Sequence, residues 1–152
     1  MNRRDFVVAG ASTIGLAIAG RSLAEDQAAQ HTHTSMGATP PWVANASLID
    51  AAADCGRAGR ICLAHCLDSL RAADKSMARC SETVSAMLPM CAAVEALAIQ
   101  GSPHIKALAA VCAKACRECE EACKVHAMHH EPCKRCMETC QRCGAACEKA
   151  AA

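Results

Sequence analysis

Residues 112–147 read CAKACRECEEACKVHAMHHEPCKRCMETCQRCGAAC, and the nine cysteines in this stretch form two runs in which neighbours are three or four residues apart. From Cys112 to Cys123 the steps are four, three and four; from Cys133 to Cys147 they are three, four, three and four. Such steps bring side chains to one face of an α-helix, at the a and d positions that leucine usually fills in a heptad. The spacing therefore predicts two helices, each with a stripe of sulfur on its inward face.

Two earlier segments carry cysteine and small apolar residues on the same period, and helix-starting and helix-ending residues divide the chain into four parts. The predicted inward stripe of the first segment is Leu48, Ala52, Cys55, Gly59, Cys62, Cys66, Ser69 and Ala73. Short connections between consecutive helices favour antiparallel neighbours. We therefore predict an all-α fold, an antiparallel four-helix bundle with a Cys-lined core. The predicted helices run from Ser47 to about Ala73, from Asp74 or Ser76 to near Gly101, from Ser102–Pro103 to about His126, and from Glu131–Pro132 to the C-terminus.

The composition supports a core that is built from sulfur. Fourteen of the 152 residues are cysteine, and the two aromatic residues are Phe6 and Trp42. After position 24, 16 of 128 residues are Leu, Ile, Val or Phe, below the roughly one fifth that a conventional hydrophobic core needs. A formal net charge of +1 argues against both disorder and nucleic-acid binding. We therefore expect one folded domain.

The first 24 residues resemble a twin-arginine (Tat) export signal. Arg3 and Arg4 precede an apolar stretch that ends near Gly20, and Ser22-Leu23-Ala24 has small residues where a signal peptidase would cleave. We expect residues 1–24 to be removed and the mature protein to be periplasmic; an uncleaved membrane anchor is the alternative. Tat substrates cross the membrane folded, which favours thiols over disulfides.

Residues 25–41 are polar and predict a flexible segment before the cysteine-rich bundle, which we place at 42–152. His31 and His33 within this segment are interpreted as solvated side chains. We expect Trp42, at the start of the bundle, to pack on its surface or on a partner subunit.

Three other uses of the cysteines compete with metal binding. If the cysteines served only as packing residues, a core of Cys and Ala would lose about 1 kcal/mol or more of stability per position relative to a core of larger apolar side chains. A disulfide scaffold fits an exported protein with an even number of cysteines, but side chains one helical turn apart run side by side rather than face each other. The C-x2-C-x2-C-x3-C-P run of a ferredoxin is absent from the sequence.

Clustered thiolates select soft metals, and charge favours Cu(I) over Zn(II). Each Cu(I) neutralises one thiolate, whereas a tetrathiolate zinc site keeps a charge of −2 that nearby cations must compensate. The predicted core positions carry no cation, and Met77 and Met87 add thioether sulfur, which suits Cu(I). A zinc-storing thiolate bundle and a structural disulfide-bonded helical protein remain the alternatives.

With its Tat-type leader and the C-x3-C-x2-C-x3-C and C-x2-C-x3-C-x2-C-x3-C runs, the chain resembles the bacterial copper storage proteins. The resemblance implies storage of many Cu(I) ions, typically held by pairs of cysteines, in a homo-oligomer that is a tetramer by family resemblance. It also implies exchange of copper with a chaperone or a copper enzyme. The candidate ligands are Cys55, Cys62, Cys66, Cys80, Cys91, Cys112, Cys116, Cys119, Cys123, Cys133, Cys136, Cys140, Cys143 and Cys147.

One end of the predicted bundle gathers imidazole and thioether groups that could pass copper in or out. Antiparallel helices bring the 74–77 and 125–130 turns to the same end, while Leu48, Ile99, Ile105 and Leu108 would form an apolar plug at the other. The sequence contains no catalytic triad or phosphate loop, so we expect no enzyme. The candidate entrance ligands are Met77, His126, Met128, His129 and His130, with Met87 and His65 as further candidates.

Overall fold

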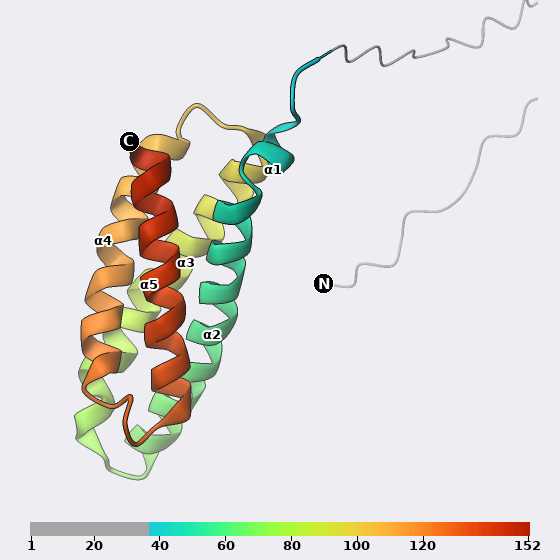
Figure 1. Cartoon of the computed structure of the whole chain (residues 1–152). Helices are drawn as coiled ribbons and strands as arrows, with labels where there is room; N and C mark the ends of the chain where they lie inside the picture. Colours follow the sequence, from blue (N-terminus) through green and yellow to red (C-terminus); the bar gives the residue numbers. More distant parts are fainter. Residues whose placement is uncertain (1–36) are drawn as a thin grey trace, which may run out of the picture. The chain divides into compact units, whose positions relative to one another are not determined.

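The computed structural model describes residues 37–152. The predicted leader at 1–24, and most of the segment at 25–41, therefore lie outside the described residues. Figure 1 shows the order of the helices along the chain. They are α1 (Pro41–Ala44), α2 (Ala46–Arg71), the short 3-10 helix η1 (Lys75–Met77), α3 (Ala78–Gln100), α4 (Ile105–Lys124) and α5 (Glu131–Ala151).

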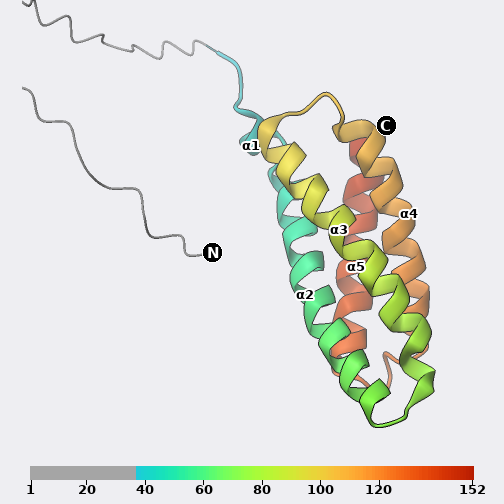
Figure 2. The same ribbon diagram turned by 180° about the vertical axis from the view of Figure 1, so that it is seen from behind.

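The all-α prediction is confirmed for residues 37–152, which contain helices, turns and no strand. Each of the four long helices runs opposite to the one before it, and the C-terminus lies beside the end at which α2 begins (Figures 1 and 2). Contacts join α2 to α3, α3 to α4, α4 to α5, and α5 back to α2. The four long helices therefore enclose a common interior, onto which their cysteine stripes face.

Three of the predicted helix boundaries agree with the structure because the expected residues play their expected roles. The carboxylate of Asp74 accepts a hydrogen bond from the backbone N–H of Ser76 at 3.0 Å, at the start of η1. Gly101 ends α3 in the left-handed conformation, with φ of 64°. Pro132 lies in the first turn of α5, where its missing N–H leaves no helical hydrogen bond unmade.

Two helices begin at other residues than predicted. Helix α2 begins at Ala46, so Ser47 lies inside it, and the side chain of Asn45 instead donates to the carbonyl of Ala98 at 3.0 Å. Helix α4 begins at Ile105 rather than at Pro103, because Ser102 and the next two residues form a separate turn. The prediction that Ser102 caps the helix is therefore wrong, because its hydroxyl belongs to the turn that precedes α4 and accepts from the backbone N–H of His104 at 3.3 Å.

The short helix α1 was not predicted. Pro41 packs so closely on the α3–α4 turn that a Cβ added at Gly101 would lie 2.7 Å from the Pro41 Cγ. Trp42, the only Trp of the chain, is 58% exposed on this helix. Glycine at position 101 thus serves both the left-handed helix end and the close approach of α1.

Helix α3 is apolar on its outer side as well as toward the core. Within the described residues, Lys75–Gln100 is a helical stretch long and apolar enough to cross a membrane by length and composition alone. Its buried residues, among them Cys80, Val84 and Cys91, face the other long helices. Because 33% of its most apolar window is buried, packing in the core accounts for only part of its apolar character.

Candidate metal centre

All fourteen cysteines are buried, and each is at most 1% exposed. Helices α4 and α5 contribute nine of them, while α2 contributes Cys55, Cys62 and Cys66 and α3 contributes Cys80 and Cys91. The prediction from the spacing, that the cysteines of each helix lie on one inward face, is therefore confirmed. The predicted stripe of α2 ends early, because Ser69 is half-buried and Ala73 is exposed.

The sulfur atoms lie close enough together to share metal ions. Hydrogen-bonding Sγ–Sγ contacts range from 3.4 Å, between Cys80 and Cys123, to 4.0 Å, between Cys143 and Cys147. A metal–thiolate bond of about 2.3 Å places two sulfurs on one ion roughly 3.8 Å apart in a tetrahedral site and roughly 4.6 Å apart in a linear one. Small movements of these thiols would therefore suffice to bind metal.

Five groups of cysteines have all their sulfurs within 4.8 Å of one another, and every cysteine of the chain belongs to at least one group. One group draws a single thiol from each long helix. The five groups are Cys55, Cys91, Cys116 and Cys143; Cys62, Cys66, Cys80 and Cys133; Cys62, Cys123 and Cys136; Cys112, Cys143 and Cys147; and Cys119, Cys136 and Cys140.

The cysteines are free thiols rather than disulfides. The shortest hydrogen-bonding contact between them, 3.4 Å, is far beyond the S–S bond length of about 2.04 Å. Neighbours on one helix, such as Cys119 and Cys123, are separated by 3.9 Å with their side chains parallel along the helix. The arrangement offers many shared ligands.

Within the described part of the chain, the interior holds no charged side chain other than the thiols themselves. Its buried polar residues are Thr83 and Thr139, each 4% exposed. Both hydroxyls donate to carbonyls of their own helices, Thr83 to Cys80 and Thr139 to Cys136, and so offer no compensation for thiolate charge. Negative charge on the sulfurs must therefore be balanced by protons or by bound cations.

Burial and mutual hydrogen bonding spread the thiol pKa values apart. Burial raises the pKa of Cys66, with hydrogen bonding to Cys80 adding to the effect. Hydrogen bonds from Cys123, Cys133 and Cys62 lower the pKa of Cys80. These hydrogen bonds favour the thiolate form at Cys80 and the protonated form at Cys66, and a metal that binds the whole cluster must displace the protons that its thiols carry.

Met87 places a thioether among the thiols. The Met87 Sδ accepts hydrogen bonds from the Sγ of Cys91 at 3.2 Å and of Cys55 at 3.5 Å. Gly59 on α2 makes room for it, because an added Cβ there would lie 2.8 Å from the Met87 Cε and 3.0 Å from the Cδ2 of Leu88. Met87 is thus a core residue and does not lie at an end of the helices.

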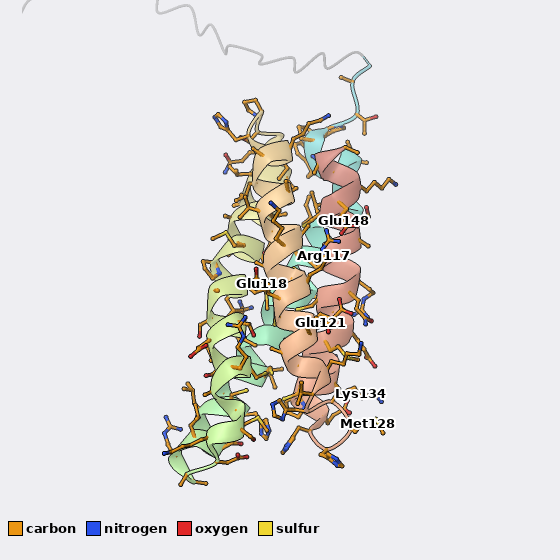
Figure 3. All side chains as sticks on the ribbon, turned by 90° about the vertical axis from the view of Figure 1, so that its left-hand side faces the viewer. Arg117, Glu118, Glu121, Met128, Lys134 and Glu148 are labelled. Carbon is orange, nitrogen blue, oxygen red and sulfur yellow. The ribbon has the colours of Figure 1, made fainter. Side chains whose placement is uncertain are left out.

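The predicted histidine-rich end is only partly assembled. His65 on α2 and His130 pair through ring nitrogens 3.0 Å apart, and the rings of His126 and His130 have centroids 6.2 Å apart. Met77 is fully buried near this end. Met128 and His129 are exposed, and Met128, 88% exposed, lies on the outside of the α4–α5 turn (Figure 3).

At the other end, the predicted apolar plug is also partial. Leu48 is buried and Ile105 and Leu108 pack against the core, but Ile99 is 42% exposed. Ile99 belongs to the outer side of α3, one position after the buried Ala98. The plug therefore consists of three of the four predicted residues.

A family model described as copper storage protein matches residues 43–152, which include all four long helices and all fourteen cysteines. The chain belongs to the copper storage protein family. It is also similar to an uncharacterized cysteine-rich protein, YhjQ, of Bacillus subtilis (strain 168), with 30% identity over 103 residues. That match covers 60% of this chain and 94% of the relative.

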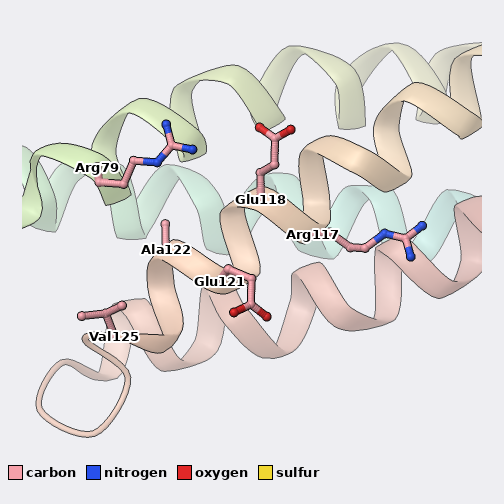
Figure 4. A pocket seen from close by; sticks show the side chains of 6 residues that line it. All are labelled: Arg79, Arg117, Glu118, Glu121, Ala122 and Val125. Atoms are coloured by element: carbon pink, nitrogen blue, oxygen red, sulfur yellow. The ribbon is translucent and has the colours of Figure 1, made fainter.

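In this member of the copper storage family, a surface groove lies apart from the sulfur. It has a volume of about 470 Å³ between α3 and α4 and is lined by Arg79, Arg117, Glu118, Glu121, Ala122 and Val125 (Figure 4). Its charged side chains stand on the outer faces of the two helices, and no cysteine lines it. The groove is a solvated seam between helices, so the metal chemistry belongs to the interior.

Sequence spacing alone did not reveal two features of the centre. The His65–His130 pair joins residues 65 positions apart, and it depends on the angle at which the α4–α5 turn folds back over α2. The close fit of Gly59 around Met87 likewise depends on how deeply α2 and α3 pack. A glycine at a predicted core position, opposite a large residue on the next helix, was the available signal for the second feature.

Proposed function

We propose that this protein stores copper as Cu(I), with many ions held by cysteine thiolates inside an antiparallel four-helix bundle that has a Cys-lined core. The observation that carries the proposal is an interior with fourteen buried thiols and, among the described residues, no buried cationic side chain. Membership of the copper storage family and the five close thiol groups support it.

Charge favours monovalent copper over zinc in this interior. A Cu(I) ion that replaces the proton of one thiol leaves the local charge unchanged, so ions can accumulate along the core without separate counter-ions. A tetrathiolate Zn(II) site keeps a charge of −2. Even the group with one thiol from each helix, which offers four ligands to zinc, has no buried cation to compensate that charge.

The test is an anaerobic titration of the reduced protein with Cu(I) against a chromophoric chelator, with a parallel titration with Zn(II). We expect copper to bind at a ratio approaching one ion per cysteine. Saturation by about three or four Zn(II) ions, with weak copper uptake, would indicate that the protein stores zinc rather than copper. Thiol titration of the denatured protein as isolated is the redox control: near fourteen supports storage, and near zero would instead indicate a disulfide-bonded protein.

We propose that copper enters and leaves at the end where His65, His126 and His130 lie, with buried Met77 beneath them. Imidazole and thioether groups bind Cu(I) as neutral ligands and can pass it to thiolates such as Cys66 and Cys133. The double variant His65→Gln/His130→Gln should slow loading and removal while the final copper content stays the same. The exposed Met128 provides the control Met128→Leu; equal rates in both variants would exclude this entrance.

The setting of the protein is also a proposal. We infer export of the folded chain to the periplasm by the Tat pathway, on the basis of Arg3, Arg4 and the cleavage signal ending at Ala24. Assembly into a homo-oligomer and exchange with a copper chaperone or copper enzyme are inferred from the family. Fractionation of cells that produce the chain with Arg3→Lys/Arg4→Lys tests export, since loss of the twin arginines should retain the protein in the cytoplasm.

A further inference from the structure

The sulfur core divides into two sets of cysteines. Among the five close groups, two share Cys143 and the other three are linked through Cys62 and Cys136, but no cysteine belongs to both sets. We call the first set the distal pool; the other eight cysteines form the proximal pool. The distal pool is Cys55, Cys91, Cys112, Cys116, Cys143 and Cys147.

The division follows from residues on α2 and α3 at the middle of the bundle. Between Cys55 and Cys62, α2 presents Gly59 to the core, and between Cys80 and Cys91, α3 presents Val84 and Met87. Val84 and Met87 therefore fill the space that thiols occupy above and below, and among the described thiols the Met87 Sδ contacts only the distal ones, Cys55 and Cys91. Only α4 and α5 carry an unbroken run of cysteines through this level.

Cys140 is where the two pools meet. Its sulfur belongs to the proximal group with Cys119 and Cys136, and it also lies 3.6 Å from the Sγ of Cys55 in the distal pool. Cys116, also in the distal pool, is another neighbour of Cys140. Each of the other hydrogen-bonding sulfur contacts joins cysteines of the same pool.

We propose that Cu(I) passes between the two pools through the thiolate of Cys140, which is their single sulfur bridge. This inference rests on the proposed storage of copper and deepens it. An ion moves along the core when an incoming thiolate binds it before an outgoing thiolate releases it, so the ion always keeps sulfur ligands. Without Cys140 a cation would have to cross a gap that holds Val84 and the neutral thioether of Met87 but no anionic partner, which is strongly unfavourable in a buried site.

The proximal pool fills first because it lies next to the proposed entrance. Cys66 and Cys80 flank the turn before α3, and Cys123 and Cys133 flank the α4–α5 turn that carries His126. The distal pool lies toward the end where Leu48 is buried and Ile105 packs. Copper that enters among the histidines therefore reaches the distal pool only after crossing at Cys140.

The test compares Cys140→Ser with Cys147→Ser. Both remove one thiol from the same stripe of α5, but Cys147 lies within the distal pool and bridges nothing. Copper uptake is followed by native mass spectrometry over time, and the amide resonances of the six distal cysteines report by NMR where the ions reside. Both variants lose one ligand and some copper capacity, but the ratio of the distal to the proximal filling rate should be about tenfold or more lower in Cys140→Ser than in Cys147→Ser.

Equal rates of distal filling in the two variants would overturn the bridge. So would slow filling of both pools in Cys140→Ser alone, because that result would make Cys140 an entrance through the α4–α5 groove that it lines. In the unaltered chain, brief loading with few ions should shift proximal resonances before distal ones; simultaneous shifts would contradict the proposal even if Cys140→Ser did not fold. Failure of the unaltered chain to bind Cu(I) would instead contradict the storage function itself.

Discussion

The helix pair α4–α5 and the helix pair α2–α3 face the same interior but build it from different atoms. The first pair supplies nine of the fourteen cysteines and covers its outer face with charged residues, with an ion pair between Arg117 and Glu148 that joins the two helices (Figure 3). The second pair supplies five cysteines and fills the remaining core positions with Leu48, Val84, Met87 and Val94. We infer that α4–α5 serves metal binding above all, whereas α2–α3 supplies hydrocarbon that stabilises the metal-free fold.

Copper loading should have the largest effect, and it should be greatest in α4 and α5. Each independent site adds about 2.7 kcal/mol at a free ion concentration of 100 times Kd, and a domain of this size gains several degrees in Tm per kcal/mol. Filling many sites should therefore raise Tm by tens of degrees. Calorimetry measures the shift, and amide hydrogen exchange should show more added protection in α4 and α5 than in α2 and α3. Uniform added protection would contradict the division of roles.

Truncation of Met87 should destabilise the metal-free protein more than truncation of a thiol on α4. Met87→Ala leaves a cavity and should lower the free energy of unfolding by about 2–5 kcal/mol. Cys119→Ala removes only one sulfur atom and should have a smaller effect. Anaerobic denaturant unfolding of both variants makes the comparison, and equal losses would show that the hydrocarbon of α3 has no special part in the metal-free fold.

Filling the space at Gly59 should have an intermediate effect. Gly59→Ala would bring a Cβ to 2.8 Å from the Met87 Cε, so the gain in helix propensity is opposed by overpacking that costs about 1–3 kcal/mol. The loss should shrink when Met87→Ala is present, because the methyl group that clashes is then absent. A double-mutant cycle measures this coupling. Additive losses would mean that Gly59 and Met87 do not interact energetically.

The smallest expected effect is the contribution of one thiol, Cys66, to the fall of metal-free stability at alkaline pH. The pKa of Cys66 is raised above its ordinary value of 9.0 by burial, so above pH 9 the unfolded chain has lost a proton that the folded chain keeps. Its contribution to stability is therefore constant below pH 9 and falls as pH rises above it, by about 1 kcal/mol over one pH unit. Denaturant unfolding of the unaltered chain and of Cys66→Ala at pH 8.5 and 10 gives this contribution as the difference between the two losses of stability, and equal losses would contradict it. A copper-loaded sample, whose thiols have already lost their protons, should show no such fall.

Much of this architecture could be predicted from residue spacing. Steps of three and four between cysteines place each stripe on one helical face whatever the neighbours do, which is why all fourteen thiols are buried as predicted. Helix ends that depend on local chemistry, such as Asp74 and Gly101, were also predictable. The start of α4 was not, because Ser102 fits both a helix cap and the turn that it actually forms.

The histidine-rich end illustrates why proximity could not be predicted residue by residue. The topology brings the 125–130 turn to the end of α2, as antiparallel helices require. Whether a side chain of that turn faces inward depends on its backbone path, which directs His130 to His65 and leaves Met128 in solvent. Helical periodicity does not predict the direction of side chains within a turn, so only the tertiary structure shows where these residues lie.

Helical periodicity and composition were sufficient to predict that sulfur lines the interior and to favour a soft metal as its ligand, because both inferences follow from which side chains share a face and from their chemistry. Tertiary packing alone decided how the sulfurs connect. The depth at which α2 meets α3 admits Met87 opposite Gly59, and the register of α5 sets Cys140 3.6 Å from Cys55. Distances between helices depend on the volumes of all the packed side chains together, and no single stripe contains that information.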